Sequence, residues 1–412
     1  MKFIVCGEVV LSRPLDGPLS AHIAGFAKCA RDQGYARYSR HRQVLLAACF
    51  SRWLGQQAVS MHRVSSGHVA RYLRRRARHV QIQRGDAAAL RQFIDFLRGQ
   101  GVIPPEKIAP RRLTPAEQGA LAFERYVRDE RVLASATVVN YVPFVRGFLA
   151  NRFGGGPVKL SRLCARDVVG FVQRQAPRLH PKRAKLLTSA LRSFLHYARY
   201  RGDIARDLAA AVPPVANWSM TSIPRAIPAH SVRQLLASIR RRTAMGRRDY
   251  AIVLLLARLG LRSSAVAFLE LDDIDWDAGQ VSVQGKGGRR TALPLPADVG
   301  EAIAAYLRHG RPRSTSRRVF LRAKAPIRGF LGPSAIGSLV RHALARAGVK
   351  APTQGPHQFR HALATQLLRH GASLAEIGEV LRHRSPETTK IYTQVDLDML
   401  RTLALPWPGG VR

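Results

Sequence analysis

The stretch His357-Gln-Phe-Arg360-His361, followed by Leu381-Arg-His383 and then by Tyr392, decides how this chain is interpreted. His357 and Arg360 stand three positions apart, so a helix would place them on one face. An arginine and a histidine can hold a phosphate, and a tyrosine hydroxyl can attack one. Taken singly, a tyrosine is usually a packing residue and a histidine often caps a helix. The combination is what points to phosphate chemistry.

The same stretch contains helix boundaries. Residues 357–369 predict a helix that Gly371 ends, because glycine readily adopts the conformation that follows a helix. Ser373-Leu-Ala-Glu376 has the pattern of a capping box, which predicts a second helix ending near Leu381. His383 is therefore expected at the C-terminal end of that second helix.

An arginine upstream is placed by a glycine. Gly260 is expected to stop a helix that runs up to Leu259, and Arg262 stands in the turn before the next helix. Ser263 or Ser264 would cap that next helix. An arginine just beyond a helix end is well positioned to reach a ligand, although by itself it is a weak signal.

A lysine upstream is placed by a hairpin. Residues 280–284 and 291–295 alternate like two strands around Gly285-Lys286-Gly-Gly288, which predicts a β-hairpin with Lys286 at its tip. Standing alone, Lys286 would be an exposed lysine of a turn. A glycine-rich turn also lets a lysine approach a phosphate closely. The turn is not a Walker loop, because no helix follows it and no Lys-Ser/Thr pair ends it.

The composition favours a polyanionic partner. The chain has 412 residues, of which 46% are hydrophobic, so it has room for two to four domains with cores of their own. Lysine and arginine number 67 against 26 aspartates and glutamates, a formal net charge of +41, so nucleic acid is the expected ligand. The cysteines form no CxxC pair and are expected to be reduced core residues. No apolar run approaches the length of a membrane span, so we expect a cytoplasmic protein without a membrane partner.

Helical spacing of apolar residues divides the first half into two similar segments. Residues 1–112 are expected to form an additional N-terminal helical domain, and residues 113–215 a helical DNA-binding domain. Ala89-Leu-Arg-Gln-Phe93 returns as Ala190-Leu-Arg-Ser-Phe194, which indicates that the first domain is a degenerate copy of the second. A chance likeness between amphipathic helices is the alternative.

A proline-rich stretch separates these segments from the rest. It predicts a linker at residues 216–227, with a C-terminal domain at residues 228–412. For the basic run in the N-terminal domain, a solvated helix end is the alternative to DNA contact. The residues expected to contact DNA are Arg74, Arg75, Arg76, Arg178, Lys182, Arg183 and Lys185.

In order and spacing, Arg262, Lys286 between two glycines, His357-x-x-Arg360, Leu-x-His383 and Tyr392 resemble the tyrosine recombinase (phage integrase) family. The resemblance covers residues 226–396 and extends to residues 113–215, which look like the family's SAM-like core-binding domain. It implies a mainly α-helical chain. Helical DNA-binding domains would be followed by an α+β catalytic domain with a small antiparallel sheet.

The resemblance also implies a role for each matching residue. Arg262 and Arg360 would clamp the nonbridging oxygens of the scissile phosphate. His357 would add a hydrogen bond and help to accept the phenolic proton. His383 stands where the family uses histidine or tryptophan to support the phosphate.

The two remaining matches are implied to carry the covalent step. Tyr392 would attack phosphorus, giving a 3′-phosphotyrosyl link and a free 5′-hydroxyl. Lys286 would protonate that leaving oxygen. The ester conserves the bond energy, so the resemblance implies a reaction without metal, ATP or any other cofactor.

One position departs from the family. An acidic residue commonly stands three positions after the first arginine, and here that position is Ala265. We expect reduced precision and not lost chemistry, with Glu270 or Asp272 as candidate substitutes. His361 is expected to be a packing residue beside the site.

The implied activity is that of a site-specific DNA recombinase or integrase, with the transposase of a mobile genetic element as one form of it. Double-stranded DNA is the implied substrate. The amphipathic tail, Val395 to Leu405, would pack on a neighbouring copy in a tetramer on paired sites, and deletion of residues 396–412 would remove it. A tail helix folded on its own domain is the alternative. Accessory recombinase proteins are further candidate partners.

Three alternatives stay open. A metal-dependent nuclease could use the acid cluster Glu270, Asp272, Asp273 and Asp275 as ligands. A DNA-binding accessory protein could have impaired catalysis, for which Ala265 is the only support. A type IB topoisomerase would use the same chemistry without strand exchange.

Overall fold

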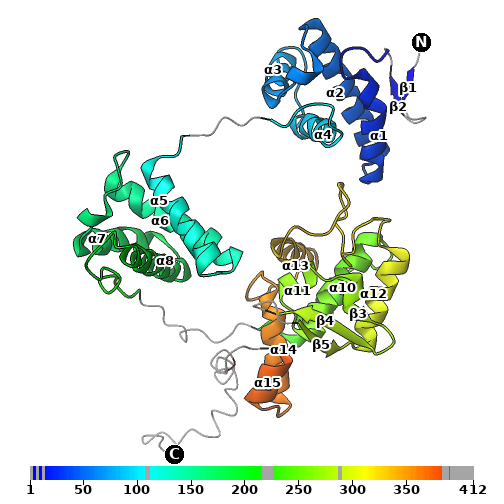
Figure 1. Cartoon of the computed structure of the whole chain (residues 1–412). Helices are drawn as coiled ribbons and strands as arrows, with labels where there is room; N and C mark the ends of the chain where they lie inside the picture. Colours follow the sequence, from blue (N-terminus) through cyan, green and yellow to red (C-terminus); the bar gives the residue numbers. More distant parts are fainter. Residues whose placement is uncertain are drawn as a thin grey trace, which may run out of the picture. The chain divides into compact units, whose positions relative to one another are not determined.

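The computed structural model describes residues 3–5, 9–11, 14–106, 112–215, 226–285, 290–382 and Thr389 (Figure 1). The chain divides into two compact units, one made of residues 1–107 and 223–412 and the other of residues 108–222. Lys286, His383 and Tyr392 lie outside the described residues, as do the tail and residues 216–225 of the expected linker.

The N-terminal segment begins with a small hairpin, in which β1 (Phe3–Val5) pairs antiparallel with β2 (Val9–Leu11), and continues as a helical bundle. Its core is aromatic: Phe26, Phe50 and Phe93 are fully buried, and the ring centroids of Phe26 and Phe93 lie 4.9 Å apart. The helical elements are η1 (Ser20–His22), α1 (Ile23–Asp32), α2 (Arg37–Gln56), η2 (Met61–Arg63), α3 (Ser66–Arg76) and α4 (Asp86–Gly99).

The segment from residue 112 to 215 is a second helical bundle with a separate buried core. Phe123, Phe148 and Phe194 meet edge to face in this core, with centroid distances of 5.6 and 6.4 Å. Its elements are α5 (Pro115–Arg125), η3 (Tyr126–Glu130), α6 (Ser135–Phe153), η4 (Leu160–Arg162), α7 (Ala165–Gln175), η5 (Ala176–Arg178) and α8 (Pro181–Tyr200).

The two bundles use similar local devices at corresponding places. In each, two helices lead to a short 3₁₀ turn and then to a third and a fourth helix. At the start of the third helix, Ser65 N donates to His68 Nδ1 at 3.2 Å, and Cys164 N donates to Asp167 Oδ2 at 3.0 Å. Cys164 is exposed at this cap, so the expectation that every cysteine is a core residue was wrong for it.

The C-terminal segment surrounds helix α10 (Ala244–Leu259) with other helices and carries a small sheet on one side (Figure 1). The predicted hairpin is confirmed as β4 (Gln280–Gln284) and β5 (Arg290–Pro294), and a short third strand, β3 (Ile274–Asp275), extends it in the order β3-β4-β5. The helices around α10 are α9 (Ala229–Ser238), α11 (Ser263–Ala267), α12 (Ala297–His309), α13 (Ser334–Arg346), α14 (His357–Arg369) and α15 (Leu374–Val380), and η6 (Leu271–Asp273) precedes β3.

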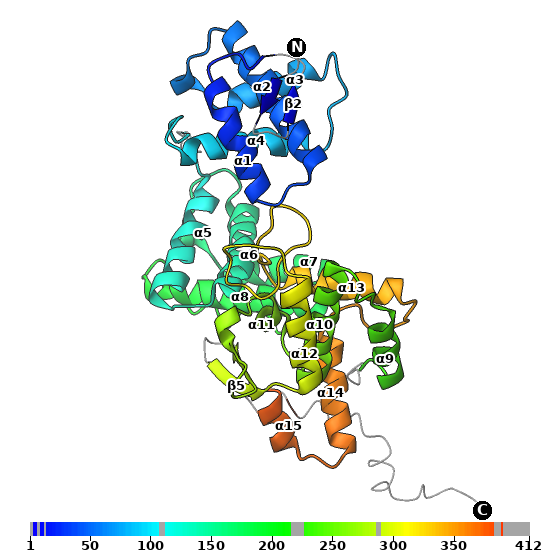
Figure 2. The same ribbon diagram turned by 90° about the vertical axis from the view of Figure 1, so that its right-hand side faces the viewer.

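Helix α10 is the centre of this segment because residues 251–256 are all buried. It packs against α12 on one side and α14 on another, and Figure 2 shows the three helices side by side. Val281 and Val283 of β4 point into the same core, while their neighbours in sequence do not. The predicted fold class, mainly α with a small antiparallel sheet, is confirmed.

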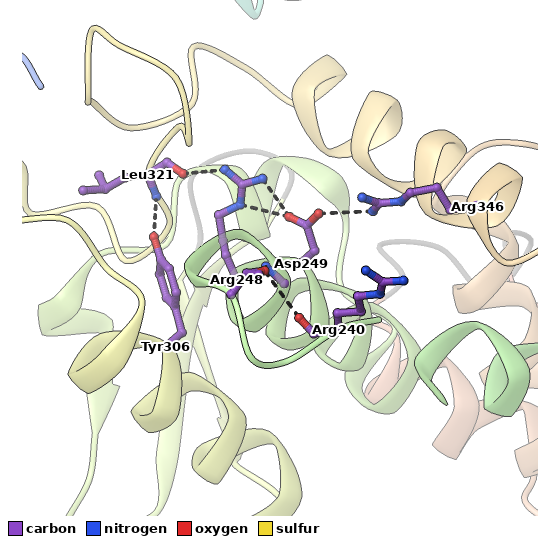
Figure 3. Close-up of polar contacts among 8 residues, drawn as sticks. Arg240, Arg248, Asp249, Tyr306, Leu321 and Arg346 are labelled. Carbon is purple, nitrogen blue, oxygen red and sulfur yellow. Dashed lines mark hydrogen bonds and ion pairs between the residues drawn. The ribbon is translucent and has the colours of Figure 1, made fainter. Parts of the chain in front are cut away.

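A buried ion pair holds the first turns of α10 in place (Figure 3). Arg248 donates from Nε and Nη2 to Asp249 Oδ1 at 3.0 and 2.7 Å, and from Nη1 to the Leu321 carbonyl at 2.9 Å. Arg346 of α13 reaches the other carboxylate oxygen at 3.5 Å. The Tyr306 hydroxyl accepts from Leu321 N at 3.3 Å, and burial raises the pKa of that hydroxyl.

None of the helices in the described part of the chain combines the length and the apolar character that a membrane span needs.

Candidate active site

Arg262 is positioned by a glycine, as predicted. Gly260 ends α10 with φ +55°, and a Cβ at this position would come within 3.0 Å of the Leu363 and Leu381 side chains. Ser263 and Ser264 do not cap the next helix, because Arg262 itself is the N-cap residue of α11 and its side chain makes no capping bond. The Arg262 side chain is therefore left for other contacts.

Arg360, on the first turn of α14, is 1% exposed. Its Nη1 donates to the Gly260 carbonyl at 2.8 Å, and its Nη2 donates to the Leu381 carbonyl. One guanidinium thus joins the turn before Arg262 to the end of α15. A phosphate can reach this group only when the chain that covers it moves.

Arg262 forms a hydrogen bond with the same backbone segment, one residue further along the chain. Its Nη2 donates to the Arg382 carbonyl at 3.3 Å. The carbonyls of two successive residues, Leu381 and Arg382, therefore receive the two arginines that the sequence paired. The next residue in the chain is His383.

His357 opens α14 and is exposed, whereas Arg360 one turn later is buried. The rings of His357 and His361 stand edge to face, with centroids 4.7 Å apart and planes at 84°. His361 thus restricts the orientation of the His357 ring. Of the predicted catalytic residues, the described part of the chain contains Arg262, His357 and Arg360, and it brings the two arginines together on one backbone segment.

Arg382 is a site residue that the sequence interpretation missed. It has φ +55°, and its Nε and Nη1 are buried without a hydrogen-bond partner in the described part of the chain. Burial, followed by the charge of Arg262, lowers the pKa of Arg382 to about 10. The only signal in the sequence is an arginine where a helix end usually has glycine.

Ala265 lines a pocket of about 190 Å³ on the side of α11 that faces the sheet. The two acids considered as substitutes do not bond to Arg262. Glu270 pairs with Arg318 at 3.3 Å, and Asp272 accepts from Arg317 Nε at 3.1 Å. Both carboxylates hold the chain before β3, and their partners are Arg318 and Arg317.

The other acids of the cluster are engaged in the same way. Asp273 accepts from Glu270 N at 2.9 Å and pairs with Arg290 at 3.4 Å, while Asp275 accepts from Ala278 N at 2.8 Å. Across residues 14–106, 112–215, 226–285 and 290–382, no group of three or more potential ligands could hold a metal ion. The acid cluster is used for capping and ion pairs.

The basic residues expected to contact DNA in the second bundle are at the end of η5 and the start of α8. Arg178, Lys182, Arg183 and Lys185 are all exposed there. The Arg183 guanidinium lies over the Phe144 ring at 5.2 Å, which fixes its direction.

In the first bundle, Arg74 and Arg75 are exposed on the last turn of α3, but Arg76 is partly buried against Tyr72. Burial is the main reason why the pKa of Tyr72 rises to about 12, and the hydrogen bond from Arg76 acts against it. Arg76 therefore also has a packing role.

The similarity of this chain to known proteins covers much more than the candidate site. The model of the phage integrase family matches residues 225–398. A Sinorhizobium fredii protein that bears the name integrase/recombinase y4rA is 56% identical over 409 residues, which cover 99% of each chain. Tyrosine recombinase XerA of Thermococcus onnurineus is 30% identical over 68% of this chain and 91% of its own.

A solved structure shares the fold. It is a lambda integrase tetramer bound to a Holliday junction, which covers 76% of this chain and 88% of its own with a TM-score of 0.52 and 15% identity.

Proposed function

The chain belongs to the phage integrase family of tyrosine recombinases and is a site-specific DNA recombinase, and from this premise we propose how its residues cleave and rejoin DNA. The observation that carries the proposal is the meeting of Arg262 and Arg360 on the carbonyls of residues 381 and 382, directly before His383. The relatives favour neither a metal-dependent nuclease nor an inactive accessory protein.

Arg262, Arg360, His357 and His383 hold the scissile phosphate. The guanidinium groups donate to its nonbridging oxygens and stabilise the charge that grows on them as phosphorus becomes pentavalent. Arg262 is only partly buried, so it meets the phosphate first. Arg360 follows when the segment around residues 381 and 382 shifts and uncovers its guanidinium.

Tyr392 and Lys286 carry out the covalent step. The Tyr392 oxygen forms a bond to phosphorus while the bond from phosphorus to the 5′ oxygen breaks. His357 accepts the phenolic proton, and Lys286 supplies a proton to the leaving oxygen. The reverse attack by a 5′-hydroxyl from a second DNA end completes strand exchange. One ester replaces another at each step, so the reaction consumes no ATP.

The domains divide the work as the sequence suggested. Residues 113–215 form the core-binding domain that approaches DNA with Arg178, Lys182, Arg183 and Lys185, and residues 228–412 form the catalytic domain after a linker at 216–227. Residues 1–112 are a degenerate copy of the core-binding domain that adds contacts through Arg74 and Arg75. The support is the separate core of each bundle and their common order of elements.

The protein acts as a tetramer on two paired DNA sites, with the tail at residues 396–412 packed on a neighbouring copy. Support comes from the structural relative, which is a tetramer on a Holliday junction. Accessory recombinase proteins would join the same complex.

A single substitution tests the chemistry. Tyr392→Phe removes the nucleophilic oxygen and little else, so the variant should bind duplexes from the flanks of its own gene as the wild type does, and form no covalent complex. A covalent complex that survives denaturation in the variant would show that another residue is the nucleophile.

A further inference from the structure

Arg382 occupies a backbone conformation that favours glycine. Its φ is +55°, and its N–H donates to the Glu379 carbonyl at 2.9 Å, so it is the residue after Leu381, the C-cap of α15. Most helices that end in this way have glycine here, because a side chain strains the left-handed conformation. Strain of this kind tends to persist where function requires the side chain.

Two nitrogens of the Arg382 guanidinium are unsatisfied. Its Nε and Nη1 are buried and have no hydrogen-bond partner among the residues that the structure describes. Buried polar groups without a partner are rare in folded proteins, and a catalytic role or the binding of an ion commonly accounts for them. The side chain therefore has donors ready for an acceptor that the free protein does not supply.

The charged group that acts on Arg382 is Arg262, which is positive as Arg382 is. Arg262 donates to the carbonyl of Arg382, and its charge, added to the larger effect of burial, lowers the pKa of the Arg382 side chain to about 10. Arg382 is therefore still protonated at neutral pH. Among the residues that the structure describes, the ion pairs of this segment involve other arginines, such as Arg258, Arg317 and Arg346. Two positive charges are held together, and an anion between them would relieve the repulsion.

We propose that Arg382 is a third arginine of the phosphate site, and that its guanidinium donates to the DNA phosphate that Arg262 holds. The proposal rests on the proposed function for the identity of that phosphate. The strained backbone, the unsatisfied donors and the like charge of Arg262 each raise the free energy of the empty site. A bound phosphate satisfies the last two, so DNA is held more tightly than by Arg262 alone.

The main test compares Arg382→Gly with the full-length wild type. Glycine keeps the carbonyl that Arg262 uses and relaxes the backbone, so the melting temperature of the variant should rise in chloride. Inorganic phosphate at matched ionic strength should raise the melting temperature of the wild type, and this shift should be clearly smaller in the variant, which retains Arg262. A merely structural role for Arg382 would lower stability and leave the phosphate shift intact.

The second readout is covalent complex formation on duplexes from the flanks of the gene. Arg382→Gly and Arg382→Gln should both slow it by about 10- to 100-fold, which is the effect of losing a hydrogen bond to a charged group. Arg382→Lys should retain part of the rate because the charge remains. Arg369→Gln, which removes an exposed arginine from the end of α14, should match the wild type in both readouts.

The two proposals fail separately. Wild-type rates and an unchanged phosphate shift in Arg382→Gly would overturn the role of Arg382, whatever Tyr392 does. If Tyr392→Phe still forms the covalent complex, the nucleophile is wrong, while the phosphate shift continues to decide the role of Arg382.

Discussion

Arg360 Nη1 and the Gly260 carbonyl are joined by a hydrogen bond of 2.8 Å, which connects α14 to the turn that presents Arg262. The turn depends on glycine for two reasons: its φ is +55°, and a Cβ would crowd Leu363 and Leu381 at 3.0 Å. The position of one predicted catalytic arginine therefore depends on the other.

Gly260→Ala should impair both stability and cleavage. We expect a loss of about 1–3 kcal/mol in the free energy of unfolding from backbone strain, together with displacement of Leu381. Gly348→Ala is the matched control, because Gly348 has φ +63° and open space around it. Denaturant unfolding and covalent complex formation would measure both variants. Equal cleavage by the two variants would show that crowding at Gly260 does not reach the site.

Arg360→Lys and Arg262→Lys should separate a buried role from a surface role. Lysine cannot replace the fork with which Arg360 bonds two carbonyls, so Arg360→Lys should cost about 1–3 kcal/mol of stability and most of the cleavage activity. Arg262 is partly exposed, and its Nη2 donates to the Arg382 carbonyl at 3.3 Å, so Arg262→Lys should lose cleavage with a small change in stability. Denaturant unfolding would be measured beside the cleavage assay. Equal losses of stability in the two variants would contradict the difference between the buried Arg360 and the partly exposed Arg262.

Local signals in the sequence predicted local structure well. The glycine at residue 260 and the capping box at Ser373 and Glu376 involve neighbours in the chain, and the structure contains both features. The residue that caps α11 was predicted wrongly. Serine is a common N-cap residue, but the turn after Gly260 brings Arg262 to the N-cap position and leaves Ser263 and Ser264 inside the helix.

Contacts between distant residues could not be read from the sequence. Arg262 and Arg382 are far apart in the sequence, and nothing in their spacing indicates that Arg262 bonds to the Arg382 carbonyl. In the motif Leu381-Arg382-His383, only the leucine and the histidine match the family. The engagement of Glu270 with Arg318 is equally invisible, because it depends on how the chain folds back beside β3.

The capping box of α15 makes a contribution to stability that depends on pH. Hydrogen bonds from the Ser373 side chain, and then from its backbone N–H, lower the pKa of Glu376 from its usual 4.5. A lowered carboxyl pKa stabilises the fold above 4.5 and loses that contribution as the pH falls through the folded value. The stability difference between the wild type and Glu376→Gln should therefore shrink below pH 4.5, when followed by denaturant unfolding at each pH.

Asp249→Asn should destabilise the catalytic domain strongly. Asp249 is 4% exposed and neutralises Arg248, which is 8% exposed, so the variant leaves a buried guanidinium without its counter-charge. Removing one partner of such a pair costs about 3–5 kcal/mol. Asp298→Asn is the control, because its pair with Arg258 is largely exposed and contributes about 0–1 kcal/mol. Similar melting temperatures for the two variants would contradict a structural role for the buried pair.

Removal of residues 396–412 should separate cleavage from assembly. The predicted catalytic residues all precede residue 396, so the truncated chain should still form a covalent complex on a single DNA site. If the tail packs on a neighbouring copy, the truncated protein should fail to pair two sites, which native gel electrophoresis with two labelled duplexes would detect. A tail that folds on its own domain predicts a different result: lower stability of the isolated protein and normal pairing of the DNA sites. A mixture of truncated and Tyr392→Phe chains gives a further control, since the intact tail of the second chain should restore pairing to complexes that contain both.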